Sequence, residues 1–150
     1  LAFAGGSREA RGVRFESCLV HENDRGEGPN AMVKLRLDDI TVAHQGDLGH
    51  ALTGEALEFL RDADVLLALA GGPPTIALGD LVAAIDSLRP AIVIPMHFKT
   101  PRVNLNILPV ESFLEEARSF PVDRPGASSL KITRALLPRE TRIVLLEHAR

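Results

Sequence analysis

Two stretches near the start of the chain alternate between apolar and polar residues. Residues 13–20 and 32–37 both show this period of two, which is typical of strands with one buried face. A polar, turn-rich loop at 22–30 separates them, and Asp38-Asp39 predicts a tight turn into a further strand at 40–43. We therefore expect this part of the chain to form hairpin-connected strands.

Continuous apolar runs follow, and a segment of helical periodicity separates them. Residues 65–70 and 91–94 are uninterrupted apolar runs, which are typical of strands covered on both faces. Apolar residues at helical spacing predict a helix over 77–88, and a shorter helix is expected to begin after Thr53 as its N-cap. A strand, a helix and a strand in so few residues predict a parallel crossover unit, which places the segments after both strands at the same edge of a sheet.

The remaining chain predicts one more helix and a β-rich end. The helix is expected over 109–120, a linker over 121–127, and strands at 130–133 and 142–146. No change of composition divides the sequence, so residues 1–150 are predicted to be part of one domain of the α/β class.

Composition narrows the class of protein. With 45% hydrophobic and 25% charged residues the chain reads as globular, and no apolar run approaches the ~20 residues that cross a bilayer. The net charge of −3 gives no general reason to expect a nucleic-acid partner, and a single cysteine, Cys18, excludes an internal disulfide framework. We therefore expect a cytoplasmic protein with a small-molecule substrate and without membrane or nucleic-acid association.

Histidines and a carboxylate follow the predicted strands. His21, Asp47 and His97 each lie just beyond the end of a separate apolar strand. One sheet edge would thus gather imidazoles and a carboxylate, a ligand set that suits Zn²⁺ and is tolerable for Mn²⁺ or Fe²⁺. His44 and His50 flank Asp47 and are candidates to orient it, contact substrate or supply a general acid; a supporting structural role is the alternative for each.

Three segments carry a more specific signal because they occur in a fixed order. They are His44-Gln45-Gly46-Asp47-Leu48-Gly49-His50, then Asp64-Val65-Leu66-Leu67 before Gly71-Gly72, and Ile94-Pro95-Met96-His97-Phe98-Lys99-Thr100. This combination resembles the C-terminal half of a metallo-β-lactamase-fold hydrolase, in the branch that contains the ascorbate-6-phosphate lactonase-like proteins. The resemblance runs from about Val13 to Thr100. It implies an αββα sandwich with a mixed sheet flanked by helices, of which this chain is the C-terminal portion.

The resemblance also implies roles for individual residues. His21 would bind one metal ion, Asp47 would bridge two, and His97 would bind the second, with zinc as the expected metal. Such enzymes hold a hydroxide between the ions, which attacks an ester, lactone, amide or phosphodiester. Asp47, His44 and His50 are therefore the catalytic candidates.

One part of the family pattern is missing from the sequence. The family takes its first metal ligands from a His-x-His-x-Asp-His motif in its N-terminal half, whereas no two histidines here are two residues apart. We therefore expect the chain, which starts at Leu1, to be a fragment whose partner is the N-terminal half of the same domain. The dinuclear site would be complete only with that half.

Two alternatives remain beside the metal-dependent hydrolase. A non-catalytic α/β binding or assembly module would have kept the fold and lost the metal site, and it would expose apolar surface or form homo-oligomers. A phosphodiesterase or nuclease of the same fold would use the same site on phosphate. The acidic net charge and the absence of Trp and Tyr argue against this last alternative.

Overall fold

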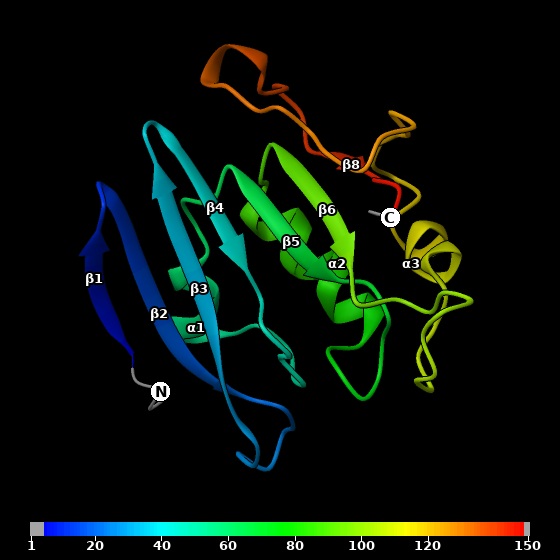
Figure 1. The fold of residues 1–150 in the computed structure, drawn as a ribbon. Coiled ribbons are helices and arrows are strands. Elements are labelled where there is room, and N and C mark those ends of the chain that lie inside the picture. The colour runs from blue at the N-terminus through cyan, green and yellow to red at the C-terminus, as the bar shows by residue number, and fades with distance from the viewer. Residues whose placement is uncertain (1–4, 149–150) are drawn as a thin grey trace.

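The computed structural model describes residues 5–148 (Figure 1). Its strands are β1 (Gly6–Ala10), β2 (Val13–His21), β3 (Pro29–Leu37), β4 (Ile40–His44), β5 (Val65–Leu69), β6 (Ile92–Met96), β7 (Val122–Asp123) and β8 (Arg142–Val144). Its helices are α1 (Gly54–Phe59), α2 (Leu78–Leu88), α3 (Val110–Glu116) and the short 3-10 turn η1 (Arg134–Leu136).

All strands join one mixed, eight-stranded sheet in the order β1-β2-β3-β4-β5-β6-β8-β7. The pairs from β1 to β4 are antiparallel, and the pairs from β4 onward are parallel. The predicted α/β class is confirmed, and so is the parallel unit made by β5, α2 and β6.

Several predicted features differ from the structure. Residues 130–133 form no strand; Leu130 and Ile132 instead pack onto the sheet surface, so their alternation reflects contact with a face rather than strand pairing. The expected linker at 121–127 contains β7, which pairs with β8. Thr53 precedes α1 as predicted, but its side chain makes no capping hydrogen bond.

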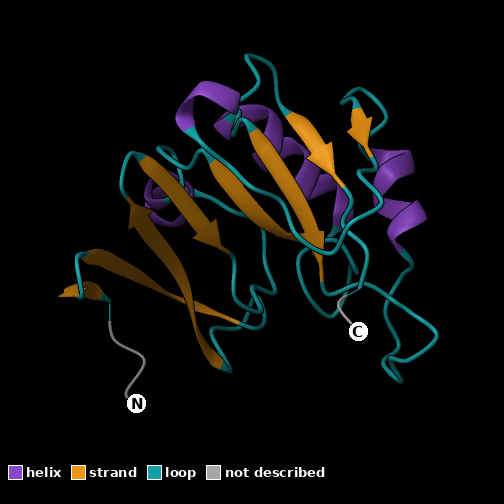
Figure 2. Ribbon diagram, turned by 45° about the horizontal axis from the view of Figure 1, so that its top comes forward, coloured by secondary structure: helices purple, strands orange, loops and turns teal. Residues whose placement is uncertain are grey.

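Helices cover one face of the sheet (Figures 1 and 2). Leu81 and Ile85 of α2 and Phe113 of α3 are fully buried there, in the same cluster as Leu66 of β5 and Met32 of β3. Because burial of such side chains is the main stabilising contribution to a fold, this layer fixes the positions of the strands. No helix within residues 5–148 has the length and apolar character to cross a membrane.

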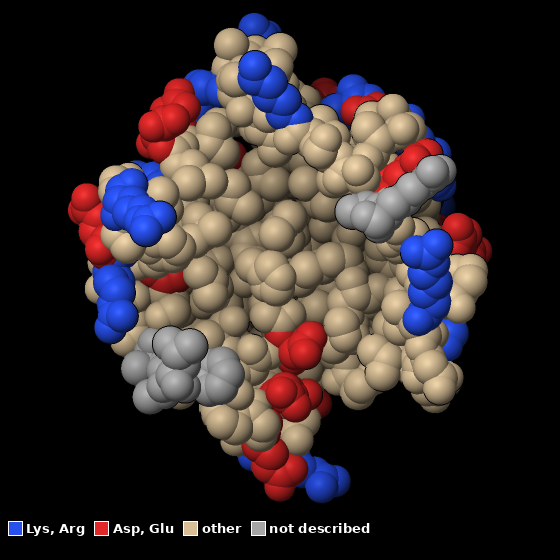
Figure 3. Space-filling view, in the orientation of Figure 1, with Lys and Arg blue, Asp and Glu red and all other residues tan. Residues whose placement is uncertain are grey.

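The opposite sheet face is only partly covered. Phe15 and Leu19 of β2 and Leu37 of β3 are 38%, 45% and 43% exposed, and the strand alternation places them on the side away from the helices. Figure 3 shows this face, on which most of the centre is uncharged and the charged side chains lie mainly around the margin. The segment 128–138 covers one part of it, where an ion pair between Arg134 and Asp64 holds the chain (Nη2 to Oδ2, 2.9 Å).

The direction of the strands decides where the connecting loops meet. β4, β5 and β6 run parallel, and β2 points the same way because β3 is antiparallel to both of its neighbours. The segments that follow these strands therefore start at a single edge of the sheet, which is the usual position of binding sites in sheets of this kind.

Candidate functional site

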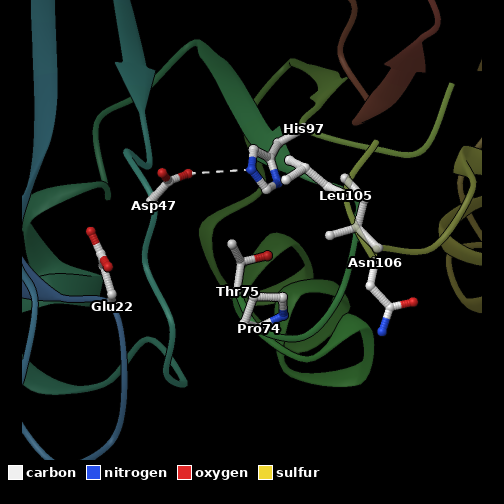
Figure 4. A pocket seen from close by; sticks show the side chains of 8 residues that line it. Glu22, Asp47, Pro74, Thr75, His97, Leu105 and Asn106 are labelled. Carbon is white, nitrogen blue, oxygen red and sulfur yellow. Dashed lines mark ion pairs between the residues drawn. The ribbon is translucent and has the colours of Figure 1, made fainter. Parts of the chain in front are cut away.

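Asp47 and His97 face each other at this edge. Asp47 lies in the turn after β4, His97 follows β6 directly, and β5 lies between these strands. The Nε2 atom of His97 is 3.7 Å from Oδ1 of Asp47 (Figure 4). This separation exceeds the roughly 2.7–3.2 Å of an N–H···O hydrogen bond, so the two groups adjoin the same space without a close bond.

The backbone around His97 is tightly constrained. His97 has a φ of 51°, a left-handed conformation that is uncommon for residues other than glycine and tends to occur at functional sites. Gly71, just after β5, lies so close that a Cβ atom there would collide with the carbonyl oxygen of His97. The Ala70 N–H donates to Met96 O at 2.9 Å, which joins the two strand ends.

Three contacts fix the turn that carries Asp47. The buried Gln45 side chain accepts a hydrogen bond from the Leu69 N–H through Oε1 at 2.9 Å. Leu48 is fully buried, and its carbonyl accepts from the Ile76 N–H at 2.8 Å. Because residues on both sides of Asp47 are anchored, the backbone of Asp47 keeps a fixed position beside the ends of the strands.

A cavity of about 560 Å³ opens beside this pair. Glu22 contributes a second carboxylate on the side of Asp47, while Leu105 stands on the opposite side near His97 (Figure 4). The complete lining comprises Glu22, Asp47, Pro74, Thr75, His97, Leu105, Asn106 and Ile107. The site therefore combines an acidic side with a largely apolar wall.

His21 and His50 line a different cavity. This space of about 350 Å³ also contains Asn23 and Asp24. Within residues 5–148, no three His, Cys, Asp or Glu side chains are grouped so that they could hold a metal ion, so the expected convergence of His21 with Asp47 and His97 is not found. The backbone of His21 does lie at the predicted edge. The side chain of the next residue, Glu22, enters the larger cavity, and successive side chains of an extended chain point to opposite sides, so the His21 side chain points away from it.

His44 and His50 form local contacts with the backbone. The Gly46 N–H donates to Nδ1 of His44 at 2.8 Å, and His50 Nδ1 lies 3.0 Å from Ala51 O. Burial lowers the pKa of His44, and the nearby carboxylate of Asp47 opposes that shift only in part. These contacts match the structural alternative for both histidines, while their catalytic roles stay predictions.

Several lining residues were not identified from the sequence. Glu22 directly follows a predicted strand beside His21, so the same strand-end argument could have included it. Thr75 follows the Gly-Gly-Pro-Pro segment, which was already placed at this edge. Leu105 and Ile107 come from a loop with no periodic or compositional signal.

The donor atoms of the pair suit a metal ion in kind but not in number. Carboxylate oxygen and imidazole nitrogen are the ligands that Zn²⁺ takes from proteins, usually as part of a set of about four. Nδ1 of His97 is buried and has no hydrogen-bond partner among the described residues. Asp47 and His97 thus fit one side of a metal site, which needs further ligands.

The chain has relatives among known sequences. Residues 3–97 match the family model described as "Beta-lactamase superfamily domain". A UPF0173 metal-dependent hydrolase of Pelotomaculum thermopropionicum is 29% identical over 136 residues, covering 83% of this chain and 60% of that protein. One from Staphylothermus marinus is 32% identical over 80 residues, covering 53% of this chain and 34% of that protein. The chain thus spans 34% to 60% of the length of these two curated relatives.

Solved structures of metallo-β-lactamase-fold proteins are also similar to this chain. A candidate Zn-dependent hydrolase of the metallo-β-lactamase superfamily from Thermotoga maritima superposes with a TM-score of 0.81 at 31% identity, covering 95% of this chain and 69% of that one. The metallo-β-lactamase fold protein YhfI from Bacillus subtilis, at 8% identity and a TM-score of 0.60, shares the fold over 95% of this chain and 50% of its own. This chain belongs to the β-lactamase superfamily and has the metallo-β-lactamase fold.

Proposed function

We propose that the whole protein is a metal-dependent hydrolase in which Asp47 and His97 bind the metal. The observation that carries this proposal is the pairing of the two side chains, 3.7 Å apart, at the mouth of a cavity of about 560 Å³. The curated relatives named as metal-dependent hydrolases support it. Zinc is the first candidate metal, with Mn²⁺ or Fe²⁺ as alternatives, because all three accept imidazole and carboxylate ligands.

The remaining ligands are proposed to come from outside residues 5–148, with His21 as a further candidate. The backbone of His21 lies at the correct sheet edge, and the Gly49 N–H of the Asp47 turn donates to its carbonyl at 3.0 Å. A turn of the strand end would bring its imidazole toward the pair, because the side chains of His21 and Glu22 point to opposite sides. A ligand set completed in this way would bind far more tightly than Asp47 and His97 alone, since affinity depends on ligand number and geometry.

The residues of this chain would have different roles in hydrolysis. A bound metal ion would lower the pKa of water and polarise the bond under attack. Asp47 and His97 would hold the reacting centre in place, and the Glu22 carboxylate would accept hydrogen bonds from water or a substrate hydroxyl. Leu105 and Ile107 would exclude bulk water from the opposite side, which strengthens electrostatic interactions inside the site.

We also propose that the open sheet face packs against the rest of the same domain. Its exposed side chains include Phe15, Leu19 and Leu37, which are apolar and lie on one side of neighbouring strands. Contiguous apolar surface of this kind usually marks a contact area. Such packing would also bring a second layer to the edge that carries Asp47.

Metal analysis of the full-length protein tests the proposal. Asp47→Ala is expected to lose bound metal and the hydrolysis of 4-nitrophenyl acetate. Asp86→Ala is the matched control, because Asp86 is a carboxylate on α2 with 69% side-chain exposure and does not line the cavity. Unchanged metal content in Asp47→Ala would overturn the assignment, and a wild-type protein that binds no metal would favour a non-catalytic module.

A further inference from the structure

The loop between β6 and α3 forms the apolar wall of the cavity. Leu105, Asn106 and Ile107 line it, and they lie only a few residues beyond His97. We propose that this loop, residues 99–108, selects the substrate and that it favours a neutral ester or lactone with an apolar acyl group. The inference rests on the proposed hydrolase function and specifies its substrate class.

Backbone hydrogen bonds fix both ends of the loop. The Lys99 N–H donates to Leu108 O at 2.9 Å, and the Leu108 N–H donates to Gly71 O at 2.7 Å. Gly71 is the residue that also packs against the carbonyl of His97. The loop is therefore attached to the same strand ends that carry the candidate metal site, so its wall keeps a fixed position relative to them.

Lys99 links the two sides of the loop. Its Nζ atom donates to Leu105 O at 2.7 Å, and this hydrogen bond is exposed. Lys99 is not one of the residues lining the cavity. Its charge thus stabilises the loop rather than meeting a substrate anion, and Lys99 acts as a positioning residue.

The chemistry of the lining favours an uncharged acyl group. Leu105 is 51% exposed, so an apolar chain lying against it would remove leucine surface from water. The ionisable lining residues are Glu22, Asp47 and His97, and none of the described lining residues is Lys or Arg. An anionic group against the wall would meet no Lys or Arg among the described lining residues, whereas a neutral chain would meet Leu105, Ile107 and Pro74.

The preference of the full-length, metal-loaded protein for esters with long or short acyl chains tests the inference. For Leu105→Ser we expect kcat/KM for 4-nitrophenyl octanoate to fall about tenfold more than kcat/KM for the acetate ester, which is the scale of a lost contact in an apolar pocket. Leu136→Ser is the matched control, because Leu136 is 68% exposed and lies in η1. An equal effect on both esters, no effect, or a preference for bis(4-nitrophenyl) phosphate would overturn the inference.

A binding measurement separates this inference from the proposed function. Binding of 2-octanone, a neutral ligand with no hydrolysable bond, can be followed by saturation-transfer NMR even if no ester is hydrolysed. We expect Leu105→Ser to weaken this binding about tenfold relative to wild type and to Leu136→Ser. Absent hydrolysis together with this loss would refute only the hydrolase proposal, whereas equal binding by both variants would refute the role of the loop.

The role of Lys99 has its own readout. Lys99→Met keeps the length of the side chain and removes the donor to Leu105 O, so we expect KM for the octanoate ester to rise while kcat for the acetate ester stays unchanged. Lys99→Arg retains a donor and is expected to restore the octanoate KM, and Lys131→Met serves as a remote control. A fall in kcat for both esters, or no rescue by arginine, would contradict a positioning role.

Discussion

Replacing Gly71 by alanine should damage both the fold and the site. The added Cβ atom would collide with the carbonyl oxygen of His97 and lie 3.2 Å from the Ile107 side chain. The colliding atom belongs to the backbone, and the hydrogen bond between Ala70 and Met96 holds the adjacent strand ends together. The strain cannot be relieved by rotating a side chain, so we expect the overpacking cost of about 1–3 kcal/mol.

Thermal unfolding of the full-length protein measures this cost. A change of 1 kcal/mol shifts the melting temperature of a domain of this size by about 2–4 °C, so Gly71→Ala should lower it by about 2–12 °C. Gly79→Ala in α2 is the matched control, because its Cβ would meet only Glu116 Oε1 at 3.7 Å, and it should stabilise the helix by up to about 1 kcal/mol. Because the strain falls on His97, metal affinity should fall in Gly71→Ala only. Wild-type stability and metal affinity in Gly71→Ala would refute this account of the strand ends.

Two further predictions follow from charged groups. Folding lowers the pKa of His44, so the unfolded chain binds more protons than the folded protein does near this pKa. The free energy of unfolding should therefore fall as the pH drops below about 6.5. NMR titration of the imidazole should give the lowered pKa, and His44→Gln should make the free energy of unfolding less dependent on pH in this range. Arg134→Met removes the ion pair with Asp64, and because the Arg134 side chain is 52% exposed the cost should be only about 1 kcal/mol. Hydrogen exchange should then quicken over residues 128–138, whereas Arg139→Met should leave it unchanged.

The buried strands were predictable because burial on both faces requires continuous apolar residues, which can be seen in the sequence. The runs that became β5 and β6 are continuously apolar, since helices and the C-terminal segment cover both of their faces. β1 has no such signal because all of its residues are exposed. Leu130 and Ile132 alternate like a strand, yet they cover the sheet instead of pairing with it.

The site was predictable to the level of the sheet edge and no further. Strand ends placed Asp47 and His97 together, because the direction of parallel strands decides which loops meet. Strand direction also places the backbone of His21 at this edge, but the direction of the His21 side chain depends on local contacts that strand order does not specify. Leu105 reaches the cavity through a loop closed by Lys99 and Gly71, a long-range contact without a local sequence pattern.

Anomalous diffraction at the zinc absorption edge, from crystals of the full-length protein, tests the central claim most directly. We expect a peak within about 2.0–2.2 Å of a carboxylate oxygen of Asp47 and a ring nitrogen of His97. A peak confined to the neighbouring cavity, beside His50 and Asp24, or a fully loaded metal with Asp47 and His97 outside its ligand set, would contradict it.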